Sequence, residues 1–449
     1  MKPLPLALDD LPPLRVPLRF FLTAPLFGVI AGLVVLVQGD TVLLSRWQPQ
    51  AIQVTHLFTL GFLLMVMIGA LFQVVPVLLG RGIPAALRVA QVVHPLLTVG
   101  SLALAFGLGG PTPSLVELGA VSLALALVVF VPLLAWRVLR RARGGDALFT
   151  IRFAVLALLC TVALGLWMAA GIAWPALGIA YRNVTDVHAG FGLFGWVLLM
   201  IMGVSQQVVP MFHVTPPFPA AVARSCGAAT FAALVVLAFA STPLVVASGE
   251  IAIAAAGLAW SMSLLLLLKR RRRRRSDATV FAWQLAGSVL VATALLTLVR
   301  TLAPALVVPW LPPHRQTLLL GVLSLLGVAS TVVLGMLPKI LAFLGFTHLQ
   351  RRCLKTPTAI PLLPTMDDLF PMPGALAQIA LHAVTLVVCV TALFAASLVR
   401  IAGALLVADF ALCAILLGMA ALRYGRASSA IARHVAGASA GPVQAAAMR

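Results

Sequence analysis

Charged side chains are scarce in this sequence. Only 9% of its 449 residues are Asp, Glu, Lys or Arg, and 62% are hydrophobic, whereas about 25% of an average soluble domain is charged. The mean hydropathy is +1.11. This composition excludes a soluble globular fold, because too few polar side chains are present to cover a surface in water. We therefore expect the protein to act in or at a lipid bilayer.

Cysteines are few and scattered. The five thiols contain no Cys-x-x-Cys pair, which excludes a disulfide framework and a thiolate metal site; they are Cys160, Cys226, Cys353, Cys389 and Cys413. Acidic residues are also rare, and the formal net charge is +20. The densest basic run, Lys269–Arg275, directly follows five leucines. We interpret it as a topology anchor that touches anionic headgroups, and we expect no nucleic-acid partner.

Apolar runs fill the chain at a length that suits membrane helices of about 20 residues. Twelve can be distinguished, at about 18–39, 54–80, 86–108, 114–136, 149–174, 184–212, 220–242, 246–268, 279–300, 316–346, 376–398 and 401–422. They predict an all-α membrane protein with twelve transmembrane helices in a single polytopic domain over residues 1–449. Residues 423–449 are expected to form a cytoplasmic tail.

The distribution of basic residues predicts the orientation. If the chain starts inside, most Lys and Arg fall in cytoplasmic segments, and the exceptions are Arg46, Arg182, Arg300, Arg315 and Arg400, with Lys339 inside the tenth helix. The positive-inside rule then places both termini in the cytoplasm. We expect a multi-pass protein of the bacterial inner membrane.

A repeat links the second, sixth and tenth helices. Each contains a glycine, seven residues, a second glycine and, four residues later, a polar residue. The three sets are Gly61, Gly69 and Gln73; Gly195, Gly203 and Gln207; and Gly327, Gly335 and Lys339. The spacing predicts three pseudo-symmetric four-helix units at about 18–140, 149–268 and 279–422. Small residues allow close helix packing, and we interpret the polar residues as core packing and snorkelling at the cytoplasmic ends.

Histidines inside the membrane are functional hypotheses by default, because burying an imidazole there is costly. His56 opens the second helix and His188 opens the sixth, both toward the outer face. We favour a ligand role for this pair. For His94 and His382 we favour hydrogen bonds between helices over a ligand role.

Two acids also fall in or beside predicted helices. Asp409 lies centrally in the twelfth helix. It is either a proton or ion site or a buried acid that is hydrogen-bonded to a neighbouring helix. Asp186 lies two residues before His188 and would either orient it or face the outer water.

A b-type haem between two helices needs two axial imidazoles, a slot of small residues and cations near the propionates. His56 and His188 supply the imidazoles. The expected slot residues are Gly61, Gly190, Gly192 and Gly195, and the expected propionate contacts are Arg46, Arg182 and Arg400. Copper is the alternative metal, with Met65, Met67, Met200 and Met202 as added ligands or as core filler.

The repeat and the two histidines resemble the catalytic subunit of the haem-copper oxidase superfamily, which is built as three four-helix arcs. Its C-class oxidases and nitric-oxide reductases carry a His-x-His-x-Gly motif followed by Gly-Trp-Val. This sequence contains a segment that is similar to that motif: Asp186-Val187-His188-Ala189-Gly190, followed by Gly195-Trp196-Val197. The resemblance implies that His56 and His188 hold a low-spin haem, and it extends to the NnrS-type nitric-oxide-response membrane proteins.

The departures from this family are specific. Asp186 stands where the first histidine of the motif belongs, the tenth helix has no histidine, and no His-His pair follows the sixth helix. A binuclear centre is therefore not expected. The resemblance implies a haem-binding, oxidase-like redox protein related to respiration or nitric oxide, with a cytochrome or quinone as electron donor. The alternative is a cofactor-free transporter of a solute or metal, although the large transporter families repeat as six plus six helices.

Overall fold

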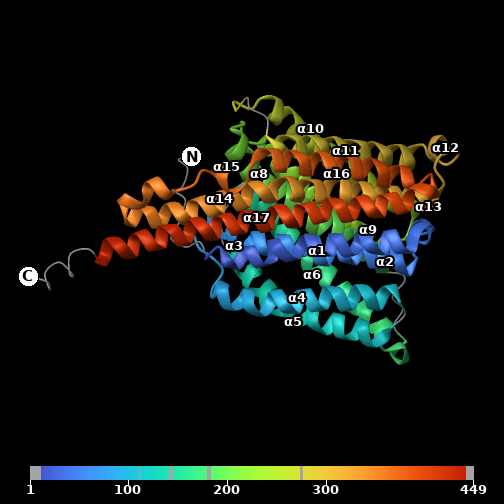
Figure 1. Ribbon diagram of the computed structural model, residues 1–449. Coiled ribbons are helices and arrows are strands. Elements are labelled where there is room, and N and C mark those ends of the chain that lie inside the picture. The colour runs from blue at the N-terminus through green and yellow to red at the C-terminus, as the bar shows by residue number, and fades with distance from the viewer. Residues whose placement is uncertain (1–11, 111, 141–144, 179–183, 274–276, 441–449) are drawn as a thin grey trace, which may run out of the picture.

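The computed structural model describes residues 12–440 except 111, 141–144, 179–183 and 274–276. Within this part of the chain all regular structure is helical, and twelve helices are long and apolar enough to cross a membrane. Figure 1 shows them side by side in one bundle. The prediction of an all-α membrane protein with twelve spans is confirmed.

The first six spans comprise elements α1 to α8. Span 1 is α1 (Arg15–Gln38) with η2 (Gly39–Leu43), and span 2 is α2 (Pro49–His56), η3 (Leu57–Leu64) and α3 (Met65–Leu79). Spans 3 to 5 are α4 (Ala86–Gly109), α5 (Pro113–Leu139) and α6 (Asp146–Ala173), which η4 (Pro175–Leu177) follows. Span 6 is α7 (Thr185–Gly190), η6 (Phe191–Leu198) and α8 (Leu199–His213).

The other six spans comprise α9 to α17. Spans 7 to 9 are α9 (Ala220–Ala238), α10 (Pro243–Lys269) and α11 (Ala278–Leu302). After α12 (Pro304–Val307), span 10 is α13 (Pro313–Val322), η7 (Leu323–Ser330) and α14 (Thr331–Lys355). Next come η8 (Pro357–Leu362), α15 (Met366–Leu369) and span 11, α16 (Met372–Ala392). Span 12 is η9 (Ala396–Leu398) with α17 (Val399–Ala440).

Spans 2, 6 and 10 each change from an α-helix to a π-helix for eight residues. The π segments η3, η6 and η7 begin four residues before the first glycine of each repeat, at Gly61, Gly195 and Gly327. π-Helical turns are rare and occur frequently at functional sites. The repeat seen in the sequence therefore corresponds to a shared backbone feature in the same register.

The six repeated glycines pack against the span that precedes each of them. A Cβ added at any of them would lie 2.0–2.7 Å from a side-chain atom of that neighbour. The pairs are Gly61 with Phe27, Gly69 with Phe20, Gly195 with Ala157, Gly203 with Ile151, Gly327 with Val289, and Gly335 with Ala282. The missing Cβ atoms thus allow spans 2, 6 and 10 to approach spans 1, 5 and 9 closely.

The packing of neighbouring spans recurs every four helices. α5 packs against α6, α10 against α11, and α17 returns to pack against α1. Inside the bundle η7 contacts both η3 and η6. Spans 2, 6 and 10 are also the most buried. In the most apolar 18-residue window of each, 78%, 56% and 56% of the residues are buried, whereas the share is 50% or less in the other described spans.

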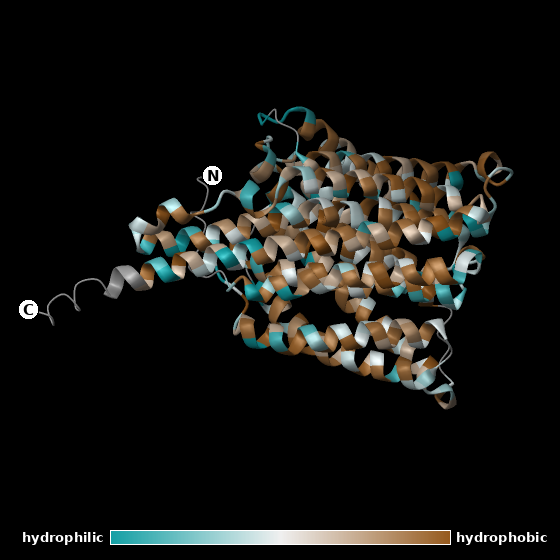
Figure 2. Cartoon of the chain, viewed as in Figure 1, coloured by the Kyte–Doolittle hydropathy of each residue, from teal (hydrophilic) through white to brown (hydrophobic). Residues whose placement is uncertain are grey.

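One end of the bundle, which we call the basic end, carries Arg81, Arg88 and Lys269 and the projecting ends of α14 and α17. Figures 1 and 2 show that these two helices extend well beyond the others and that the bundle between its ends is mostly hydrophobic. The projecting ends enclose a small apolar cluster of Leu349, Cys353, Ala359 and Ile431. The described part of the expected tail, 423–440, therefore continues span 12 as a helix instead of forming a separate segment.

Candidate functional site

His56 and His188 lie just before the π segments of their spans. His56 is the last residue of α2, and its Nδ1 lies 2.8 Å from the carbonyl oxygen of Ile52. His188 lies in α7, and its Nδ1 lies 3.1 Å from the carbonyl oxygen of Thr161 in α6. The ring of His188 rests on Gly165, where an added Cβ would come within 3.0 Å of Cε1.

These two contacts define the tautomer of both rings. A carbonyl oxygen only accepts, so each Nδ1 must carry the hydrogen, and a neutral ring then has its lone pair on Nε2. No described residue makes a hydrogen bond to Nε2 of either histidine. Histidines that bind metals almost always donate their other N–H in this way, which orients the ring and raises its basicity. Both imidazoles are therefore prepared to donate Nε2 to a metal.

An ion pair ties together the ends of the two spans. Both terminal nitrogens of the Arg46 guanidinium bind the Asp186 carboxylate, at 2.5 and 3.2 Å. Asp186 therefore bonds Arg46 and makes no bond to His188 in the described structure. The two side chains are 39% and 69% exposed, so this pair contributes little to stability. It links the turn before α2 to α7, the two helices that carry the histidines.

The two histidine-bearing spans are joined at the end that carries the histidines. The Arg46–Asp186 ion pair links the turn before α2 to α7. Further along the spans, η3 and η6 both contact η7. Spans 3, 4 and 5 complete an arc between them, since α2 packs on α4, α4 on α5, and α5 on α6. The pair predicted from the sequence is thus brought to one region of the bundle.

The expected glycine slot is wrong. Gly61 and Gly195 are filled by Phe27 and Ala157 of the preceding spans. Added Cβ atoms at Gly190 and Gly192 would lie 3.2 Å from Leu234 and 3.3 Å from Thr161. Small residues indicate close packing but do not say against which neighbour, and here all four face other helices.

The expected propionate cations are only partly available. Arg46 is engaged by Asp186. Arg400 lies against Gly39, where an added Cβ would come within 3.4 Å of its Nε, so it covers the end of α1. Arg182 lies outside the described residues.

The copper alternative gains no support from the described residues. No group of three or more His, Cys, Asp or Glu side chains gathers there as a metal ion would need. Met65, Met67, Met200 and Met202 are all buried in the main hydrophobic core.

The other two membrane histidines make the interhelical hydrogen bonds that we favoured. His94 Nε2 lies 2.9 Å from the Thr23 hydroxyl of α1. His382 Nε2 lies 3.0 Å from the Thr331 hydroxyl of α14, and its Nδ1 lies 2.7 Å from Asp409 of α17. Asp409 is thus buried and bonded to the neighbouring helix α16.

A further buried ionic cluster was missed in the sequence. Lys339 does not snorkel: its ammonium lies 3.1 Å from Asp277, the N-cap of α11, and the two side chains are 13% and 3% exposed. Thr279 donates to Asp277 at 2.5 Å and lies 3.4 Å from His213. Burial opposes ionisation of Asp277, but the Thr279 hydroxyl and the Lys339 ammonium hold its pKa below the ordinary value. An acid placed to cap a helix directly after a basic loop was the available signal.

Lys339→Met should lower the free energy of unfolding by about 3–5 kcal/mol, because Asp277 would keep a buried carboxylate without its counter-ion. The double variant Lys339→Met/Asp277→Asn should regain most of this loss, since no buried charge then remains unpaired. Thermal unfolding of the purified proteins in one detergent measures both. Equal stability of wild type and Lys339→Met would show that the ion pair contributes nothing.

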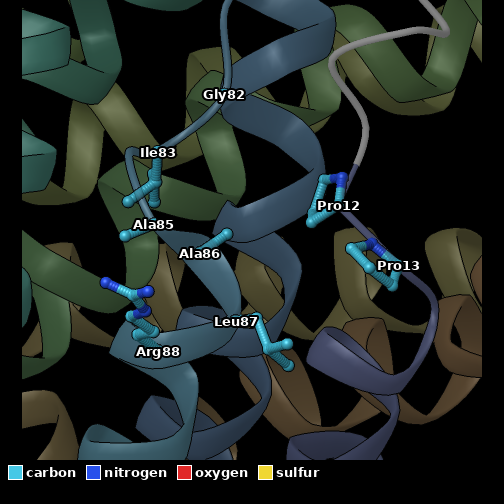
Figure 3. Close-up of a pocket in the computed structure, with 8 residues that line it drawn as sticks. All are labelled: Pro12, Pro13, Gly82, Ile83, Ala85, Ala86, Leu87 and Arg88. Carbon is cyan, nitrogen blue, oxygen red and sulfur yellow. The ribbon is translucent and has the colours of Figure 1, made fainter.

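A shallow pocket of about 390 Å³ opens at the basic end and contains neither histidine. Figure 3 shows Pro12 and Pro13 facing the turn at Gly82 and Ile83 and the start of α4. Ala85 in this turn has a left-handed backbone, with φ of 48°. Arg88 is the only charged residue in the lining, so the pocket does not extend the candidate site.

No model of a known protein family matches the chain, and no curated protein matches it significantly.

Proposed function

We propose that this protein binds one b-type haem between spans 2 and 6, which His56 and His188 would hold through Nε2. The observation that carries the proposal is the matched state of the two rings, each of which donates Nδ1–H to a backbone carbonyl and leaves Nε2 free. A bound haem would supply one-electron redox chemistry. The chain would orient both imidazoles through Ile52 and Thr161 and hold the helix ends through Arg46 and Asp186.

A binuclear oxidase centre is not proposed, because most of the other six histidines are committed elsewhere. Five of them bond side chains of other helices or loops: His94, His213, His348, His382 and His434. The proposed role is electron transfer linked to respiration or nitric oxide, with a cytochrome or quinone as donor.

The architecture supports a distant relation to the haem-copper oxidase superfamily. The π segments in register, the glycines that pack on the preceding span and the packing that recurs every four helices are all expected of three four-helix units. We propose that these units are related by a rotation about an axis normal to the membrane. Three equivalent units divide a full turn into rotations of about 120°.

The absorption spectrum of purified, reduced protein tests the haem proposal. After haem-replete expression, a split b-type signature is expected. A colourless protein would overturn the proposal and favour the alternative, a cofactor-free transporter.

We also propose that the basic end faces the cytoplasm of a bacterial inner membrane, which places both termini inside. A reporter fused after Arg275 should therefore score as cytoplasmic. A fusion after Trp174, at the opposite end of span 5, is the matched control and should score as periplasmic. The reverse pattern would overturn the orientation and move His56 and His188 to the inner face.

A further inference from the structure

A buried polar cluster joins spans 10, 11 and 12 away from His56 and His188. His382 of α16 and Asp409 of α17 are both 0% exposed, and Gln378 of α16 is 1% exposed. His382 Nδ1 lies 2.7 Å from Asp409 Oδ2, and Gln378 Nε2 donates to Asp409 Oδ1 at 2.5 Å. The carboxylate therefore has a partner at each oxygen.

The other edge of His382 contacts the π segment of span 10. Its Nε2 lies 3.0 Å from the Thr331 hydroxyl and 3.3 Å from the carbonyl oxygen of Leu326. The Thr331 hydroxyl also donates to this carbonyl at 3.0 Å. Thr331 has one hydroxyl hydrogen, so when Leu326 receives it, Nε2 of His382 must itself carry a hydrogen and donate.

Charge and hydrogen bonding together decide between the protonation states of the pair. A neutral His382 beside an ionised Asp409 would leave one net negative charge in the membrane interior, which is costly. An imidazolium beside a carboxylate has no net charge, and its Nε2–H has acceptors in Thr331 and Leu326. A neutral imidazole beside a carboxylic acid would also have no net charge, but the hydrogen bond that Gln378 donates to Asp409 Oδ1 favours the ionised carboxylate.

Among the described residues, no bond joins another charged group to His382 or Asp409. Arg300 of α11 pairs with Glu250, and Arg400 of α17 lies against Gly39. The nearest titratable groups on the same helices are the buried thiols of Cys389 and Cys413, which both interact with Asp409. α1 packs on α17, but its ionisable residues, Arg15 and Arg19, lie in its first turns. The ammonium of Lys339 in α14 is paired with Asp277.

Two buried oxygens in the same elements add to the polar character of the region. Gln378 Oε1 and Ser330 Oγ, the latter in the last residue of η7, have no hydrogen-bond partner among the described residues. Ser330 and Gln378 are at most 1% exposed. Buried polar groups of this kind are commonly satisfied by internal water, which would give a proton a route among them.

We propose that His382 and Asp409 form a proton-binding site inside the membrane, which holds an imidazolium–carboxylate pair at neutral pH. The ligand is a proton. When it is bound, Nε2–H of His382 donates to Leu326 of η7 and to the adjacent Thr331. Loss of the proton would force the Thr331 hydroxyl to turn from Leu326 toward His382. Occupancy of the site is thereby linked to the π segment that contacts both η3 and η6. The proposal does not depend on haem.

Nitrogen-15 NMR of histidine-labelled full-length protein tests the site, with His382 assigned by loss of its signals in His382→Gln. In wild type, both ring nitrogens of His382 should be protonated at neutral pH, where an ordinary histidine ring is mostly neutral. In Asp409→Asn the ring should be neutral at that pH, because its counter-ion is gone. His94 is the matched control, since it bonds a threonine but no carboxylate, and it should be neutral.

An unprotonated ring nitrogen on His382 of wild type at neutral pH would overturn the proposal. This measurement needs no variant beyond the one used for assignment, so it decides the matter even if Asp409→Asn does not fold. A His382 ring that stays doubly protonated in folded Asp409→Asn would also overturn it, because the carboxylate would then not be what holds the proton.

Discussion

His56→Ala and His188→Ala should each abolish or convert the reduced b-type spectrum. Removing a ligand should cost more than the about 10–100-fold in metal affinity that is typical when only an outer hydrogen-bond partner is lost. Each variant would also leave a single imidazole to hold the haem. Haem content per protein and the reduced spectrum, measured after identical purification, report both effects.

His94→Ala is the matched control for these variants. His94 also lies in a span and is half-buried, but its Nε2 is bonded to Thr23. Its loss should leave the spectrum intact. A full b-type spectrum in both His56→Ala and His188→Ala would contradict the assignment of these residues as haem ligands. They would then be polar contacts between helices, and the cofactor-free transporter would be the better-supported function.

Gly403→Leu should prevent stable folding, because α1 and α17 approach each other through their backbones at this point. An added Cβ at Gly403 would lie 2.4 Å from the backbone nitrogen of Leu36, and one at Gly32 would lie 2.7 Å from that of Val407. Backbone cannot move aside as a flexible side chain can, so the cost should exceed the about 1–3 kcal/mol usual for overpacking. The fraction of monodisperse protein and the thermal unfolding midpoint measure the loss.

Gly418→Leu provides the control within the same helix. No atom lies within 4 Å of a Cβ added there, so the change should stay within about 0.5 kcal/mol of wild type. If both variants fold equally well, the close packing of α1 on α17 does not determine stability.

The twelve spans could be predicted because apolar length alone specifies a membrane helix, and the repeat could be predicted because its glycines recur at one spacing. The residues at which the helices end were harder to predict from the sequence. Span 10 runs as Pro313–Lys355 and α17 to Ala440, beyond the predicted 346 and 422. Outside the bilayer, hydropathy no longer marks a helix, and here the cluster around Cys353 and Ile431 keeps both helices extended.

The candidate site shows the same division. The sequence was enough to select His56 and His188, since an imidazole in an apolar run is conspicuous. It did not show that each ring would donate to a carbonyl, and it misplaced Gly61, Gly190, Gly192 and Gly195 as a haem slot. It also did not show that Lys339 would pair with Asp277, 62 residues away.

The sequence by itself therefore determined the class of protein, the number of spans, the register of the repeat and the identity of the polar residues in the membrane. Only the tertiary structure decided which of those residues meet: His382 with Asp409, Lys339 with Asp277, and each glycine with its neighbouring helix. The physical reason is that burial in lipid is a property of each segment's composition and can be summed along the chain. The partner of a side chain instead depends on the rotation and depth of two helices, which the packing of the whole bundle sets.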